Sequence, residues 1–485
     1  MPTDTLTETQ AGSLVSELAK IVGSGNVLDR IEGRRKFSGD MSWLSIVAAA
    51  RGRQLSRQDA VVTVRSTEEV AEVLRLANRL GMPVTPFGGG SGVQGAANAD
   101  RGGILLNLRE MKRIRKLDEK SLTCTVECGL TVQNFEAELN RKGLSFTHFP
   151  ASAEWATVGG CLAARGSGVL STKYGKIEEH VLSIELVTPT GEVLHTPVVP
   201  RHAAGPELTQ LLIGSEGTLG IITAVTVRLR NLPASRVFGT FTFKQLEAGI
   251  EAGRRIMTSG LKPAVLRLYD EQATKHSLER AVEANLSDSA MLLMFDGDHA
   301  AVAQAEASAA FGICAELGGK NLGSATGERW WEKRYVFYYP PYAPELPSIW
   351  CTMDVVADFA HITDVYYKVT QAMRGAVDPK WNMSLNTHFS HWYDWGSMIY
   401  PRFKIPVGPE NYADALALHD AIVDAATKAA LKAGAVINDH HGVGMRLGGY
   451  MKDQLGVSGL DMLQRIKSAM DPKNVLCPGK LGLKA

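Results

Sequence analysis

Several short segments between residues 60 and 232 are rich in apolar and β-branched residues and are bounded by glycine, proline and polar residues, a pattern typical of β-strands. These segments are 60–64, 83–87, 102–108, 121–129, 180–197 and 220–230. Between the first two segments, apolar residues recur at helical spacing as far as Leu80. The run Ser66-Thr67-Glu68-Glu69 has the form of a capping box and Gly81 follows the last turn, so we expect a helix over 67–80.

Around Asn231-Leu232-Pro233 the pattern changes, and residues 236–439 alternate longer apolar strands with helices. Helices are expected there at 245–259, 300–317 and 413–433. The length of 485 residues also favours more than one domain. We therefore expect an α+β protein with domains at 1–235 and 236–439 and a C-terminal segment at 440–485.

Charge and composition argue against several classes of protein. The chain has 52 basic and 51 acidic residues, and this net charge of +1 provides no field to hold nucleic acid or an anionic membrane. It lacks an apolar run long enough for a transmembrane helix, and its polar N-terminus lacks the basic region of a secretory signal. The six cysteines form no C-x-x-C pair, so we expect buried, reduced thiols and a cytoplasmic protein.

A glycine-rich loop follows the strand at 83–87, with the sequence Pro86-Phe87-Gly88-Gly89-Gly90-Ser91-Gly92. Consecutive glycines let backbone N–H groups converge on an anion such as a pyrophosphate, and the alternative is a flexible surface turn. Residues 90–95 also match G-x-G-x-x-G, the dinucleotide fingerprint. That motif must open a helix, but here it runs into the turn-rich segment 96–103, so we reject a Rossmann nucleotide site.

Two further glycine-rich segments, 152–168 and 214–223, lie between strands of the same half. Three such loops predict one extended ligand along the domain. With K-Y-G at 173–175 and D-P-K-N-V-L-C-P-G-K at 471–480, they resemble the FAD-binding domain of the vanillyl-alcohol oxidase/p-cresol methylhydroxylase (PCMH) superfamily. The resemblance implies a PCMH-type FAD-binding domain and an α+β substrate (cap) domain, with the C-terminal segment returning to the FAD domain.

The resemblance also implies which residues bind FAD. They are Pro86, Phe87, Gly88, Gly89, Gly90, Ser91, Gly92, Ser152, Thr157, Gly159, Gly160, Gly166, Gly217, Gly220, Ile222 and Lys480. Cys477 stands where the family usually has asparagine. Some relatives attach FAD through a histidine in the first glycine loop, but this loop contains neither histidine nor cysteine, so we expect non-covalent FAD.

The second half is similar to the group that contains D-lactate and glycolate dehydrogenases and alkyl-dihydroxyacetone-phosphate synthases. The segments that carry this likeness are 265–270, 387–393 and 439–444. The last segment reads D-H-H-G-V-G, so Asp439 replaces the first of three histidines typical of the synthases. The implied catalytic residues are His388, His391, His440, His441, Arg267 and Tyr393.

Imidazoles suit the removal of a hydroxyl proton while hydride leaves the carbon for flavin N5. A metal site is the competing interpretation of the histidines, but the usual G-D-G-N-x-H context is missing and we expect no metal. Arg267 is either a surface strand residue or the anchor of an anionic substrate group, and Tyr393 is a weaker candidate for holding a substrate oxygen.

Eight aromatic residues lie in the 21 residues from 330 to 350, whereas the whole chain is 7% aromatic. They indicate a pocket or lid for an apolar or aromatic substrate, or equally a dimer contact or ordinary core. We expect a homodimeric FAD oxidoreductase that acts on an alcohol, 2-hydroxy acid or phenolic carbon and passes electrons to O₂ or another acceptor. The alternatives are redox-neutral, flavin-dependent group transfer and a non-catalytic flavin carrier.

Overall fold

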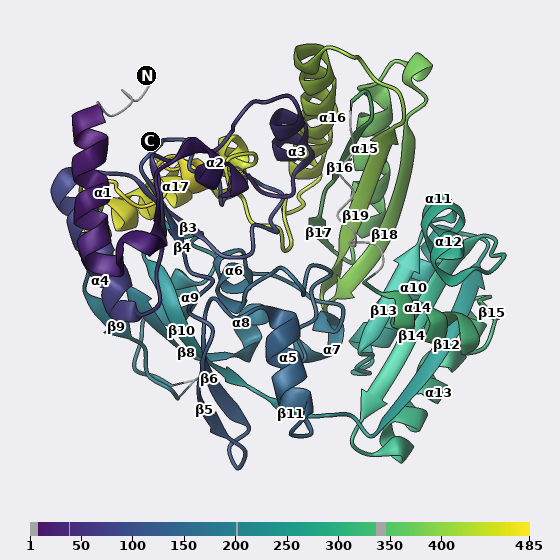
Figure 1. Cartoon of the computed structure of the whole chain (residues 1–485). Helices are drawn as coiled ribbons and strands as arrows, with labels where there is room; N and C mark the ends of the chain where they lie inside the picture. The colour runs from purple at the N-terminus through teal and green to yellow at the C-terminus, as the bar shows by residue number, and fades with distance from the viewer. Residues whose placement is uncertain (1–7, 38, 200–201, 336–345) are drawn as a thin grey trace.

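The computed structural model describes residues 8–37, 39–199, 202–335 and 346–485. Two halves lie side by side (Figure 1). Two small sheets and both ends of the chain form one half, and one large sheet with its helices forms the other. Helices and strands are mixed in both halves, which confirms the expected α+β class.

The first sheet has the order β1 (Val27–Leu28), β2 (Ala60–Thr63), β4 (Ile104–Asn107) and β3 (Val84–Phe87), and the last three strands are parallel. Helix α4 (Thr67–Leu80) connects β2 to β3 and ends at Gly81 in the left-handed conformation. The Ser66 hydroxyl accepts from the Glu69 N–H, but the Glu69 carboxylate accepts from Arg65 rather than from Ser66. No helix lies between β3 and β4, as the rejection of a Rossmann fingerprint requires.

The second sheet of this half is antiparallel, and the hydrophobic core beside it contains buried cysteine thiols. Its order is β5 (Ile114–Asp118), β6 (Thr123–Glu127), β10 (Ile221–Arg228), β8 (Val181–Val187) and β9 (Val193–His195). Phe135 of α5 (Val132–Asn140) and Val158 of α6 (Val158–Ala163) pack in the same core as Cys124 and Cys128. A short pair, β7 (Leu144–Ser145) with β11 (Arg230–Asn231), lies beside it.

The large sheet of the second half is antiparallel. Its order is β15 (Lys320–Asn321), β12 (Ser235–Phe243), β14 (Ser289–Gly297), β13 (Val265–Tyr269), β18 (Ser384–Trp392), β19 (Gly396–Ile405) and β16 (Ile349–Thr352), and β17 (Val355–Asp358) also pairs with β19. One face packs against α10 (Leu246–Thr258), α13 (Ala300–Glu316), α15 (Ile362–Gly375) and α16 (Tyr412–Lys432). The other face is covered at one end by α12 (Glu279–Val282) and α14 (Ala325–Lys333).

Segments from both ends of the chain join the two halves. Trp43 of α3 (Trp43–Ala50) packs in the core of the large sheet, although the sequence division placed it in the first domain. After α17 (Met451–Met470), the chain returns to the first sheet, where the Val84 N–H donates to the Val475 carbonyl at 2.7 Å. Lys173 and Tyr174 bind the Asp296 carboxylate of β14 at 2.9 and 2.8 Å.

The remaining α-helices are short apart from the first. They are α1 (Glu8–Val22), α2 (Ile31–Arg34), α7 (Ser171–Tyr174), α8 (Ile177–His180), α9 (Leu208–Leu212) and α11 (Glu271–Ala273). Within the described ranges, none of the helices combines the length and apolar character needed to cross a membrane.

Candidate active site

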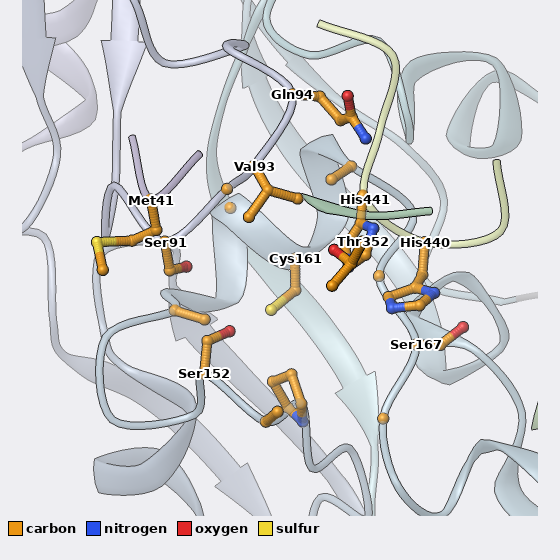
Figure 2. Close-up of a pocket in the computed structure, with 18 of the residues that line it drawn as sticks. Met41, Ser91, Val93, Gln94, Ser152, Cys161, Ser167, Thr352, His440 and His441 are labelled. Carbon is orange, nitrogen blue, oxygen red and sulfur yellow. The ribbon is translucent and has the colours of Figure 1, made fainter. Parts of the chain in front are cut away.

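A cavity of about 1120 Å³ lies between the glycine-rich loops and the free face of the large sheet. Ser91 and Ser152 lie at one side in the close-up view, and His440, His441 and Ser167 lie at the other, with Cys161 between them (Figure 2). The cavity therefore joins the three predicted ligand loops to the predicted histidines.

The glycines of the first loop have two different roles. A Cβ atom at Gly89 would lie 1.9 Å from the Trp155 carbonyl oxygen, and one at Gly88 would lie 2.4 Å from the Thr157 hydroxyl. These two glycines thus allow one cavity loop to pack on the next. At Gly92, in contrast, a Cβ would meet nothing within 4 Å and would enter the cavity.

The space beside these loops fits FAD. Gly92, Gly160 and Gly166 all line the cavity, and a Cβ at each would have only open space or contacts of 3.2 Å and longer. Side chains there would fill a cradle along which an extended cofactor could lie close to the backbone. The first glycine loop, which no helix follows, would hold its phosphates through backbone N–H groups without a helix dipole behind them.

Most of the predicted cofactor residues lie on the cavity wall. Those that do are Pro86, Gly88, Gly89, Gly90, Ser91, Gly92, Ser152, Thr157, Gly159, Gly160, Gly166, Gly217, Gly220 and Ile222. Phe87 and Lys480 are not among the lining residues. The Phe87 ring is buried and packs edge-on against Phe37.

The structure differs from the prediction that Lys480 reaches the flavin region. Its buried ammonium donates to the carbonyls of Gly95 and Asn98 at 3.0 and 2.7 Å and to the Asp100 carboxylate at 2.8 Å. A lysine has three donors, so these contacts use all of them. Lys480 therefore stabilises the loop after the glycines instead of contacting a ligand.

The wall opposite the loops is built from alternate residues of β18 and β19, because successive side chains of a strand point to opposite faces. The lining residues are Ser384, Asn386, His388 and Ser390 from β18 and Met398, Tyr400, Arg402 and Lys404 from β19. The intervening Leu385, Phe389 and Ile399 belong to the core on the other face. The sequence analysis missed Tyr400 and Arg402, although this alternation could have revealed them.

His391 reaches the same wall through a β-bulge. It is three residues from His388, so in a regular strand the two side chains would point to opposite faces. The pairing of β18 with β19 shifts register between Ser390 and Trp392, and His391 has a φ of 52°. This extra residue brings its imidazole to within 4.8 Å of the His440 ring, measured between centroids.

Two buried carboxylates hold three of the four imidazoles. The Asp439 Oδ2 atom lies 2.9 Å from Nδ1 of both His391 and His440. The Asp354 Oδ1 atom lies 2.8 Å from Nδ1 of His441, and its Oδ2 lies 3.1 Å from Nδ1 of His440. Neither carboxylate was predicted as a site residue. Asp354 carries no local signal, because it precedes its partners by more than eighty residues.

The imidazoles differ in charge. Burial and the neighbouring His441 lower the pKa of His440 to about 4, so this ring is neutral at pH 7. Burial also lowers the pKa of His441, but the charge and hydrogen bond of Asp354 outweigh it and leave that pKa raised. The site thus places a neutral imidazole beside one that favours the cation.

Arg267 also lies on the cavity wall, where its Nη2 donates to Nε2 of His388 at 2.6 Å. Burial and the Arg267 charge hold the pKa of His388 well below its usual value, so this ring is neutral. Among the described residues, no hydrogen-bond partner is found for the buried Arg267 Nε. Arg267 is therefore a wall residue with an unused donor, not a residue of the protein surface.

Tyr393 was expected to hold a substrate oxygen, but it is not among the lining residues. Its hydroxyl donates to the Asp439 Oδ1 atom at 2.5 Å, and its ring stacks on Trp395. Tyr400 instead lies beside the histidines, with its hydroxyl 3.5 Å from Nε2 of His441. Tyr393 therefore lies behind the cavity wall, where it binds Asp439, and Tyr400 is the tyrosine on the wall.

The predicted aromatic segment contributes to the cavity in part. Trp330 and Trp350 line it, whereas Trp331 lies under the Arg334 guanidinium, 3.9 Å from ring centroid to Cζ. The other aromatic residues named by that prediction, except Tyr335, lie outside the described residues.

Two sets of three side chains have the composition and spacing of metal ligands. They are Asp354, His440 and His441, and His391, Asp439 and His440. Within each set the imidazole Nδ1 atoms are already 2.8 to 3.1 Å from carboxylate oxygens. Hydrogen bonds between the imidazoles and the carboxylates account for this arrangement. That the protein needs no metal ion stays a prediction.

Comparisons with known proteins agree with this geometry. Residues 58–197 match the family model of an FAD binding domain, and residues 232–481 match the C-terminal domain of FAD linked oxidases. Alkyldihydroxyacetonephosphate synthase of Trypanosoma brucei brucei is 29% identical over 455 residues, which cover 87% of this chain and 73% of that protein. Glycolate oxidase subunit GlcD of Bacillus subtilis (strain 168) is 26% identical over 471 residues, which cover 96% of each chain.

A third relative is the mitochondrial cytochrome D-lactate dehydrogenase of Arabidopsis thaliana, 28% identical over 433 residues, with 87% of this chain and 73% of that protein covered. Among solved structures, p-cresol methylhydroxylase with bound substrate has a TM-score of 0.80 at 17% identity over 99% of this chain and 98% of that chain. An alkyldihydroxyacetonephosphate synthase structure has a TM-score of 0.78 at 24% identity, with 98% and 86% covered. These structures share the fold.

Proposed function

Because the chain belongs to the FAD-linked oxidase family and is an FAD enzyme, we propose that it oxidises a small 2-hydroxy acid or a related anionic alcohol. One observation carries the choice of an anionic substrate. The Arg267 guanidinium lines the cavity wall and donates to the neutral His388. A guanidinium favours a carboxylate as the acceptor.

The charges around the cavity support the same substrate class. Among the described residues that line it, Glu216 is the one acidic side chain, whereas five are Lys or Arg. The Glu216 carboxylate accepts from the N–H groups of Val443 and Gly444 at 2.5 and 2.8 Å, and burial raises its pKa to about 7. The wall therefore offers little negative charge to repel an anion.

His440 is the proposed base. Its Nδ1 lies between two carboxylates that can only accept, so Nδ1 carries the proton and Nε2 keeps its lone pair. FAD, when bound, supplies the hydride acceptor. The substrate hydroxyl proton would pass to His440 Nε2 while the carbinol C–H bond breaks with its electron pair, leaving a carbonyl. Asp439 and Asp354 would stabilise the imidazolium so formed.

Anaerobic mixing with D-lactate, glycolate or D-mandelate tests this proposal. We expect one of them to bleach the flavin absorbance stably. If none of the three does so while dithionite reduces the flavin normally, the 2-hydroxy-acid proposal is wrong.

The second candidate is redox-neutral group transfer, favoured by the 29% identity to an alkyldihydroxyacetonephosphate synthase. The Arg267 donor would then hold a substrate phosphate instead of a carboxylate. Acyl dihydroxyacetone phosphate with a fatty alcohol would be turned over without net bleaching. Turnover of this kind would replace the first candidate with the second.

We further propose that FAD is bound without a covalent bond and that no metal is needed. Burial raises the pKa of both cysteines on the cavity wall, Cys128 and Cys161, the latter to about 12, so these thiols are protonated and poor nucleophiles. Acid precipitation should release all flavin into the supernatant, and dialysis against EDTA should leave bleaching unchanged. The expected homodimer and cytoplasmic location are tested by light scattering and by cell fractionation.

A further inference from the structure

The Asp439 carboxylate lies where three parts of the chain meet. Its Oδ2 accepts from Nδ1 of His391 and His440 at 2.9 Å and from the Ser167 hydroxyl at 3.1 Å. Its Oδ1 accepts from the Tyr393 hydroxyl at 2.5 Å. We call these five residues the Asp439 cluster. Ser167 comes from a cavity loop, the His391 and Tyr393 side chains from the large sheet, and His440 from the C-terminal segment.

The carboxylate of this cluster is anionic although it is almost completely buried. Burial by itself would raise its pKa, but the hydrogen bonds from His391 and His440 outweigh burial and hold the pKa of Asp439 well below its usual value. The Lys176 ammonium, 4.0 Å from Oδ1, adds a compensating positive charge. An ionised carboxylate has no proton to donate, so each of its four partners must be a donor.

The donor requirement determines the tautomers of two rings at once. His391 and His440 must both carry a proton on Nδ1, so Nε2 is the nitrogen of each ring that can accept a proton from a molecule in the cavity. Both rings line the cavity. With a histidine in place of Asp439, the two Nδ1 atoms would lack a shared anionic acceptor.

The backbone at His391 also depends on this contact. Its φ of 52° is a left-handed conformation that costs a non-glycine residue free energy, on the order of 1 kcal/mol. The bulge persists where surrounding contacts hold it, and the hydrogen bond to Asp439 is the polar contact of the His391 side chain that the structure shows. The carboxylate therefore holds the ring on the cavity side of the sheet.

We propose that Asp439 is a positioning residue that fixes His391 and His440 as Nδ1–H tautomers and directs both Nε2 atoms toward the substrate. This proposal rests on the proposed function for its kinetic consequence. Its structural consequence, the tautomer of each ring, is independent of any substrate. Asp439 itself is not among the residues that line the cavity.

The tautomers are measured on holoenzyme labelled with [¹⁵N]histidine, by long-range ¹H–¹⁵N correlation near pH 7.5. Single His→Gln variants assign the rings. In the wild type, we expect Nδ1–H for His391 and His440. In Asp439→Leu, a side chain of similar size leaves no acceptor for either Nδ1 proton, so at least one ring should change to the Nε2–H tautomer. Wild-type rings in the Nε2–H form, or an unchanged pattern in the variant, would overturn the proposal.

The kinetic test of the proposal uses the hydroxy acid that bleaches the flavin. Asp439→Leu should slow flavin reduction roughly 10²–10⁴-fold, the range of a lost general base, with an apparent substrate Kd within about threefold of the wild type. FAD content should stay equal. An unchanged reduction rate would overturn the proposal even if the tautomers change. If no acid bleaches the flavin, the proposed function fails, and the tautomer measurement still decides the role of Asp439.

The chain supplies a matched control in Asp358 and His361. The Asp358 carboxylate lies 2.6 Å from Nδ1 of His361, and both side chains are more than half exposed, away from the cavity. Asp358→Leu removes the same type of contact. It should leave flavin reduction and the spectra of His391 and His440 unchanged. A loss of reduction in this variant equal to that in Asp439→Leu would mean that the effect is not specific to the Asp439 cluster.

Discussion

The guanidinium of Arg267 donates to Nε2 of His388 at 2.6 Å, and its own Nε is left without a partner among the described residues. The two side chains come from adjacent strands, β13 and β18, and lie on the cavity face of the sheet. This pair therefore places a guanidinium in the cavity wall while keeping the imidazole neutral.

Substitution Arg267→Lys should weaken anion binding. Lysine lacks the planar fork that serves His388 and a carboxylate together. A charge-assisted hydrogen bond contributes about 1.5–3 kcal/mol, so the Kd of oxalate, read from the flavin spectrum, should rise roughly 10–100-fold. Arg329→Lys, on an exposed residue outside the cavity, is the control. Equal oxalate affinity in both variants would place the anion site elsewhere.

Gly92→Val should yield a folded protein that has lost most of its FAD. A Cβ at this position meets nothing within 4 Å and enters the cavity, so the cofactor is displaced while the loop is preserved. The ratio of absorbance at the flavin band to that of the protein measures retention. Gly375→Val, also at an open position but away from the cavity, should keep full occupancy.

Gly89→Ala should act through folding instead. Its Cβ would lie 1.9 Å from the Trp155 carbonyl, so the two loops could not pack and the melting temperature should fall. A variant that melts like the wild type would show that the loops separate at little cost.

Gly166→Ala should slow the reaction of reduced flavin with O₂. Gly166 lies on the cavity wall, has no left-handed φ, and has room for a methyl group at 3.4 Å from the Cys161 carbonyl. The turn itself therefore does not demand glycine, and the added methyl would block the approach of O₂. Reoxidation of photoreduced enzyme in air should slow roughly tenfold, a barrier increase of about 1.4 kcal/mol. Equal rates would favour an acceptor other than O₂.

Glu216 should make the stability of the holoenzyme depend on pH. Burial raises its pKa to about 7, from 4.5 for an exposed glutamate. Its folded pKa is thus above the unfolded one, so its stabilising contribution is complete below pH 4.5 and is lost as the pH rises through 7. The loss is on the order of 3 kcal/mol.

The measurement is the melting temperature of wild type and Glu216→Gln from pH 4.5 to 8. The wild type should lose stability relative to the variant across this range. Glu110→Gln, at an exposed position, should follow the wild type at every pH. Parallel curves for wild type and Glu216→Gln would show that the carboxyl is already ionised at low pH.

Strand and helix positions could be read from the sequence because they depend on near neighbours. The short apolar, β-rich runs became β2, β3, β4, β6, β8 and β10, and Ser66 and Gly81 bound α4 as expected. The glycine loops were recognisable for the same reason, since backbone freedom is a property of the residue itself. The likeness to FAD-linked oxidases also rested on short motifs, and the family models confirm it.

The tertiary structure alone decided which groups of the site are in contact and which of them carry a proton or a charge. Asp354 binds His441 from 87 residues away, a bulge brings His391 to the face of His388, and Lys480 turned out to hold a loop instead of a ligand. Tyr393 was expected in the cavity, but its hydroxyl serves Asp439, and Tyr400 lies there instead. Periodicity records only local geometry. Tautomers, pKa shifts and strand register depend on charges and partners that folding brings together from distant parts of the chain.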